Sequence, residues 1–211
     1  RLGHAVADRD HRGQLSPSSV FALRMSQSSG QARVIRFFEQ VPLVAAVVVL
    51  VVAIGTLFEW YNGLDPAPGF YPGGIAMGPL ACVAFVMNAL GLAFASKRGR
   101  PFALRVTSIV LACIVVLITV IEFASWLAGR DLGLDLLMFR DQLLRAPWNP
   151  PGRMAINTAS GICLGSLSII ALHADDRTGR GVAHWIALVG GTIGFLGLVG
   201  YAFGVSRLYS M

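Results

Sequence analysis

The chain has 211 residues, of which 55% are hydrophobic and only 13% are charged, and its formal net charge at pH 7 is +6. Soluble domains carry about 25% charged residues, so this composition predicts an integral membrane protein. On a membrane protein a basic excess indicates topology rather than nucleic-acid binding, and we expect no nucleic-acid partner.

The amino-terminal segment 1–38 is polar and basic. It holds six arginines, many serines and glycines, and no long apolar run, which excludes a secretory signal peptide within it. We expect a cytoplasmic tail, partly disordered, followed by a transmembrane domain over residues 39–211.

Five apolar segments of this domain are long enough to form membrane-spanning helices. A helix needs about 20 apolar residues to cross a hydrocarbon core of roughly 30 Å. The stretches 40–58, 75–96 and 154–172 contain no charged residue, and 106–128 contains one, Glu122. The predicted fold class is an all-α integral membrane protein with five transmembrane helices, at about 40–60, 75–96, 106–128, 154–173 and 184–206.

Between the third and fourth spans, residues 132–144 read LGLDLLMFRDQLL. Apolar residues recur there at helical spacing, with charge on the other face, and the segment is too short to cross a bilayer. We therefore expect an amphipathic helix lying along the external membrane interface.

The distribution of lysine and arginine predicts the orientation of the chain. With the amino terminus in the cytoplasm, 12 of the 17 basic residues lie on the cytoplasmic side, as the positive-inside rule requires. The loops 61–74 and 129–153 then lie outside. The second of these carries four arginines, which we interpret as paired or functional.

Two segments of the chain resemble each other. Residues 77–96 read MGPLACVAFVMNALGLAFAS and residues 154–173 read MAINTASGICLGSLSIIALH, and each is followed by a short basic loop and a further helix. Those further helices end in WLAG at 126–129 and YAFG at 201–204. An internal repeat of a helix pair is predicted, with a site at the interface of the two copies as one option.

Glycines mark the expected helix-packing faces. In lipid, small residues that allow close backbone approach drive the association of helices. Gly190, Gly194 and Gly197 share a face of the fifth span, and Gly161 and Gly165 form another face on the fourth. We expect these two helices to pack together, and the alternative is a subunit interface.

Glu122 is the central candidate for a functional site. A carboxylate within a membrane helix has either a partner or a function. We keep two interpretations, an interhelical ion pair of Glu122 with Arg153 and a small-ligand or proton site at the outer membrane face. The candidate residues are Glu122, Asp131, Asp135, Arg153, Asn157 and Thr158.

No nucleotide-binding glycine loop, nucleophile elbow, pair of catalytic carboxylates or zinc-ligand spacing occurs in the sequence. The three cysteines lie in three different spans without metal-ligand spacing. We therefore expect no enzymatic activity, no cofactor and no metal.

Residues 106–173 resemble the amino-terminal multi-helix membrane sensor module of bacterial PAS, histidine-kinase and diguanylate-cyclase proteins. In that module a helix ends in an LLEY-like run, followed by G-x-D-x-G-I-D-x-L-L-F and P-G-R-M-x-x-N-T-A. The corresponding letters here are VIEFASWLAG, RDLGLDLLMF and PGRMAINTA. The matched positions include Glu122, Asp131, Gly133, Asp135, Pro151, Gly152, Arg153, Asn157 and Thr158.

The resemblance implies a multi-pass protein of the bacterial inner membrane that serves as a sensory input module and lacks an output domain of its own. The expected partners are the lipid bilayer and other membrane protein subunits or a second copy of the chain. The alternative function is that of a non-catalytic accessory or structural subunit in a larger membrane complex.

Overall fold

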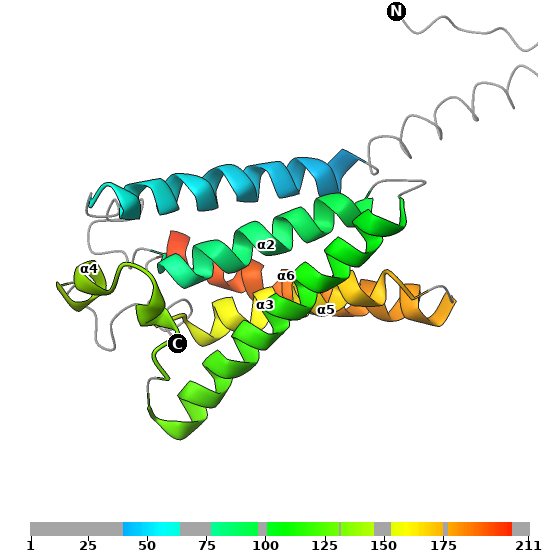
Figure 1. The fold of residues 1–211 in the computed structure, drawn as a ribbon. Coiled ribbons are helices and arrows are strands. Elements are labelled where there is room, and N and C mark those ends of the chain that lie inside the picture. The colour runs from blue at the N-terminus through cyan, green and yellow to red at the C-terminus, as the bar shows by residue number, and fades with distance from the viewer. Residues whose placement is uncertain are drawn as a thin grey trace, which may run out of the picture. The chain divides into compact units, whose positions relative to one another are not determined.

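The structure is a computed structural model in which every described element is helical (Figure 1). It describes residues 40–63, 77–96, 101–130, 132–145, 153–174 and 177–203. The chain divides into the units Arg1–Pro42 and Leu43–Met211. The expected tail, residues 1–38, lies outside the described residues.

Four helices in the described part of the chain are long and apolar enough to cross a membrane. The fifth apolar helix has only 16 residues, fewer than the roughly 20 that a span requires. An all-helical fold with helices of membrane-spanning length is therefore confirmed, with four such helices where five were predicted. The four are Gln40–Tyr61, α2 at Pro79–Ser96, α3 at Phe102–Ala128 and α6 at Arg177–Ala202, and the short one is α5 at Ile156–Ala171.

The helices begin at positions that hydropathy alone does not indicate. Proline favours the first helical position because its missing N–H is not needed there, and α2 accordingly starts at Pro79 rather than near residue 75. The start of α3 follows Pro101, which is extended, so this helix includes Arg105. The start of α6 at Arg177, rather than near 184, adds a charged turn outside its apolar stretch.

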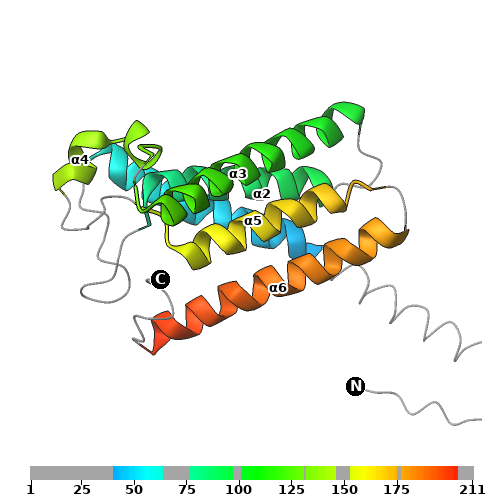
Figure 2. The same cartoon turned by 90° about the horizontal axis from the view of Figure 1, so that it is seen from below.

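Successive apolar helices alternate in direction (Figure 1, Figure 2). The ends of α3 and α6 lie at the same end of the molecule as the beginnings of α2 and α5. The central helix is α5, which packs against α2, α3 and α6, while α2 also packs against α3.

Small side chains fill the contacts among α2, α3 and α5. Ala84, Ala112 and Ala159 are completely buried, and residues of this size allow helices to approach closely. Ser108 adds a hydrogen bond between helices by donating to the carbonyl of Gly91 at 2.8 Å. The main apolar cluster consists of Leu80, Ala81, Ala84, Val115, Met154, Ala159 and Ile162.

Two helix ends share a sequence pattern and a backbone geometry. Trp60 near the end of the helix Gln40–Tyr61 is followed by Gly63, and Trp126 near the end of α3 is followed by Gly129. The two glycines have φ values of 62° and 61°, a left-handed conformation that glycine adopts without steric cost. In each case the glycine N–H donates to the tryptophan carbonyl, at 3.2 Å and 3.3 Å.

Both tryptophans also connect the end of one helix to the beginning of the next. Trp60 Nε1 donates to the carbonyl of Met77 at 3.0 Å, and Trp126 Nε1 donates to the carbonyl of Met154 at 3.2 Å. The first carbonyls that accept hydrogen bonds within α2 and α5 belong to Gly78 and Ala155. The indoles therefore bind the carbonyls just outside these helices.

We predict that Trp126→Phe lowers the free energy of unfolding by about 1–3 kcal/mol, because the carbonyl of the buried Met154 loses its donor. Trp185→Phe is the matched control, because this side chain is 70% exposed, and we expect a change below about 0.5 kcal/mol. Denaturation of the purified protein in detergent, followed by circular dichroism, measures both. Equal losses in the two variants would contradict the role of the indole donor.

Candidate functional site

The segment between α3 and α5 is two short helices, not the single amphipathic helix that was predicted. A 3-10 turn covers Asp135–Leu137, and α4 covers Arg140–Arg145. Phe139 interrupts the segment with a φ of 54°, which is uncommon for a residue other than glycine. The Phe139 ring stacks on Trp60 with 6.2 Å between centroids, so a contact with the first helix holds the break in place.

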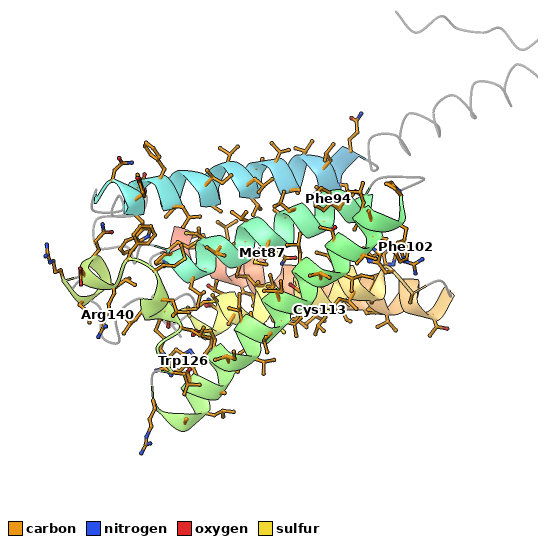
Figure 3. All side chains as sticks on the ribbon, in the orientation of Figure 1. Met87, Phe94, Phe102, Cys113, Trp126 and Arg140 are labelled. Carbon is orange, nitrogen blue, oxygen red and sulfur yellow. The ribbon has the colours of Figure 1, made fainter. Side chains whose placement is uncertain are left out.

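This segment, residues 132–145, lies at the end of the molecule where α2 begins and α3 stops (Figure 1), and we call it the cap. Leu143 of the cap is completely buried, and Leu134 packs against the main apolar cluster. Figure 3 shows Arg140 of the cap and Trp126 of α3 at this same end. The cap is thus part of the packed structure rather than a free external loop.

Two of the predicted site residues are buried carboxylates at the cap end. Glu122 on α3 is 1% exposed, and Asp135 in the 3-10 turn is 3% exposed. The sequence pattern placed Asp135 on the polar face of an interfacial helix, whereas the structure buries it in the 3-10 turn. Burying an ionised carboxylate is costly unless charges or hydrogen bonds compensate, so both carboxylates require partners at this end of the molecule.

Arg153 contacts an aromatic ring instead of forming the predicted ion pair with Glu122. Its Cζ lies 4.0 Å from the centroid of the Trp126 ring. The buried Nε and Nη2 atoms of Arg153 have no hydrogen-bond partner among the described residues. The reason for this arrangement is local, because the hydrogen bond from Trp126 to Met154 brings the indole against the neighbouring Arg153. A contact of this type contributes about 0.5–2 kcal/mol.

A groove of about 410 Å³ forms the second part of the candidate site. It exists because α2 and α6 both pack against α5 and leave part of its surface uncovered between them. Its volume lies within the range of about 300–1,000 Å³ that is usual for small-molecule pockets. The lining residues are Phe85, Asn88, Asn157, Thr158, Gly161, Ile162, Gly190, Ile193, Gly194 and Gly197.

The predicted packing glycines divide into two groups. A Cβ at Gly190 would lie 3.1 Å from the Cβ of Leu164, so this glycine does mediate the contact between α5 and α6. A Cβ at Gly161 or Gly194 would meet no atom within 4 Å. Their missing side chains therefore leave open space in the groove, but the backbone oxygen of Gly161 lies 3.7 Å from the Cβ position at Gly190 and so takes part in the contact between α5 and α6.

The remaining glycines of the predicted faces accommodate asparagine side chains. A Cβ at Gly165 would lie 2.9 Å from the Nδ2 atom of Asn88, and one at Gly197 would lie 3.6 Å from that of Asn157. The room at Gly165 allows Asn88 Nδ2 to donate to the carbonyl of Ile162 at 3.3 Å. The sequence prediction missed Asn88, although a carboxamide within an apolar span is itself a signal, because lipid offers it no partner.

Asn157 and Thr158 lie where the groove approaches the cap end, at the first turn of α5. The Oδ1 atom of Asn157 accepts a hydrogen bond from the backbone N–H of Thr158 at 2.8 Å. Asp131, another candidate residue of the predicted site, lies outside the described residues, as do Pro151 and Gly152. Within the described ranges, no three His, Cys, Asp or Glu side chains are grouped closely enough to hold a metal ion.

Comparisons with protein-family models, with curated proteins and with solved structures find no match to this chain.

We predict that Gly190→Ala lowers the free energy of unfolding by about 1–3 kcal/mol, because the new methyl group would press on Leu164 and separate α5 from α6. Gly194→Ala on the same helix is the control, and its methyl group enters open space. Thermal unfolding in detergent should show no loss of stability for the control. The assignment of Gly190 to packing fails if the two variants are equally stable.

Proposed function

We propose that this protein is a membrane-embedded sensory input module, without catalytic activity of its own, that responds to a cue at the cap end. The observation that carries the proposal is the contact of Arg153 with the Trp126 ring, at the end of the molecule that also holds the buried carboxylates Glu122 and Asp135. Ionisable groups at membrane depth are costly and mark functional positions. Here they gather where α3, the cap and the beginning of α5 meet.

The geometry supports a switch with two arrangements of Arg153. In the structure its guanidinium lies on the Trp126 ring, while the Nε and Nη2 donors have no partner among the described residues. The Nε–Nη2 edge of a guanidinium is suited to bidentate binding of a carboxylate. Movement of Arg153 from the ring to a carboxylate would satisfy these donors and shift the beginning of α5 relative to α3, and a cue biases such an equilibrium.

A five-span topology with a cytoplasmic amino terminus belongs to this proposal. The alternating helix directions support the five spans, because α5 begins at the end of the molecule where α3 and α6 stop (Figure 2). Contacts with α2, α3 and α6 allow a short helix to cross the bilayer within protein rather than lipid. The proposal further places the module in a bacterial inner membrane, with the cap on the outer side.

The matching hydrogen bonds of Trp60 and Trp126 support the helix-pair repeat. The residues that receive them, Met77 and Met154, are those at which the two sequence copies align. Repeats of this kind arrange helices around a pseudo-symmetric interface. The groove, with α5 on one side and α2 on the other, then lies between the corresponding helices of the two copies.

Selective labelling tests the topology. In a variant whose three cysteines are replaced by alanine, Asp141→Cys in the cap should react with a membrane-impermeant maleimide in intact spheroplasts. Pro101→Cys, at the opposite end of α3, should react only after the membrane is permeabilised. Both positions are exposed, so accessibility within the protein does not limit the reaction. The reverse labelling pattern would overturn the orientation.

Replacement of Arg153 tests the sensory role. In the cells that produce the protein, we expect Arg153→Gln to abolish the cue-dependent change in second messenger or in partner phosphorylation, at unchanged abundance in the membrane. Arg140→Gln is the matched control, because Arg140 is an exposed arginine of the cap. A loss of abundance without a change in signalling per molecule would favour the accessory-subunit function instead.

A further inference from the structure

We infer that the groove between α2, α5 and α6 binds a neutral, lipid-soluble molecule that carries a hydroxyl or carbonyl group on an apolar body. The inference deepens the proposed function. The identification of this molecule as the cue rests on the proposed function, whereas its binding does not. Binding itself follows from the chemistry of the groove wall.

The hydroxyl of Thr158 is the first group that points to such a ligand. Six serine and threonine hydroxyls in the described helices donate to the carbonyl four residues earlier, which is the usual arrangement in a helix. For Thr158 that carbonyl belongs to Met154 and already accepts the Trp126 indole. Thr158 Oγ1 makes no hydrogen bond with a described residue, and it lines the groove.

The carboxamide of Asn88 supplies the second polar group. One amide hydrogen binds the Ile162 carbonyl at 3.3 Å, and its Oδ1 atom accepts no hydrogen bond from the described residues. An amide oxygen in a wall that faces lipid loses free energy unless a donor reaches it. A ligand hydroxyl can donate to Asn88 and accept from Thr158, whereas a ligand carbonyl can accept from the second amide hydrogen or from Thr158.

The rest of the wall excludes a charged ligand and admits an apolar body. None of the ten lining residues is charged, so an ionised ligand would enter without a counter-charge, which is strongly unfavourable at low dielectric. Phe85, Ile162 and Ile193 offer apolar surface. Open space at Gly161 and Gly194 lets a chain lie directly against the helix backbones.

The groove is connected to the proposed switch through the first turn of α5. Thr158 lies four residues after Met154, whose carbonyl holds the Trp126 indole against Arg153. A ligand that engages Thr158 therefore acts on the helical turn whose carbonyl positions the switch. This link supplies the differential interaction that a ligand needs in order to shift a conformational equilibrium.

Photoaffinity labelling of the purified full chain in nanodiscs tests the inference. The probe is a diazirine-bearing undecanol, and its attachment sites are mapped by mass spectrometry. We expect labelling of groove residues that 1-undecanol and 2-undecanone compete away, while undecane and undecanoate compete at least tenfold less well. Equal competition by undecane would overturn the assignment of a hydrogen-bonding ligand.

A filled groove and a matched control complete the test. Gly194→Leu places a side chain in the groove and should reduce labelling at least tenfold. Gly191→Leu is the control, because a Cβ there also meets nothing within 4 Å and Gly191 does not line the groove. Thr158→Val should weaken competition by 1-undecanol about fivefold to tenfold. Unchanged labelling of Gly194→Leu, with the fold intact by circular dichroism, overturns the inference.

The ligand could be a bilayer lipid or a free lipophilic molecule. Mass spectrometry of the lipids that remain bound after purification distinguishes these two sources. Loss of bound phospholipid in Gly194→Leu, but not in Gly191→Leu, identifies an ester carbonyl of a bilayer lipid as the occupant. Unchanged lipid content, with labelling still lost, identifies a free lipophilic molecule. If labelling behaves as expected but Gly194→Leu signals normally, the groove binds its ligand and the identification of that ligand as the cue is wrong.

Discussion

The hydrogen bond from the Trp126 indole to the Met154 carbonyl is the interaction on which the arrangement of the cap end depends. A carbonyl just before a helix has no partner within that helix, and in a membrane no water is available to supply one. An indole from the preceding helix satisfies it. The same bond brings the Trp126 ring against Arg153. One constraint on backbone chemistry therefore determines the position of the cation.

The central position of α5 explains how this short helix carries so many polar groups. Its neighbours supply partners that lipid cannot, as when Asn88 of α2 donates to the Ile162 carbonyl and Ser168 of α5 donates to the Ala183 carbonyl of α6 at 2.9 Å. At its other end, Arg105 of α3 donates to the carbonyl of His173 at 2.6 Å, a favourable position for a cation because carbonyls at a helix end have no partner within the helix. The helix is thus stabilised by contacts with protein along its length, and it does not need an apolar surface on every side.

Sequence patterns predicted the helices and the end of the molecule at which charge is buried, because both follow from local hydropathy. They did not predict the break in the cap, since Phe139 is held by Trp60, a residue of the first helix that is distant in the chain. Nor did the spacing of glycines distinguish Gly190, which contacts Leu164, from Gly194, which faces open space. That distinction depends on how far α2 and α6 stand apart over α5, which is a property of the assembled helices. The partner of Arg153 was wrong for the same reason, because an indole four residues along α3 from Glu122 reaches it instead.

The proposed repeat explains why a charged group contacts Trp126 but not Trp60. Trp60 and Trp126 make the same hydrogen bond to the methionine that precedes the next helix, which indicates that this bond serves the fold in both copies. Their second contacts differ, because Trp60 stacks on Phe139 whereas Trp126 lies under Arg153. In the sequence, the residue before Met77 is Ala76, which has no charged group to place on a ring. The fold requires only the indole and the carbonyl, so the arginine of the second copy is an addition to a contact that is already complete. An addition of that kind, at the end of the molecule that buries two carboxylates, is more readily explained by a function than by stability.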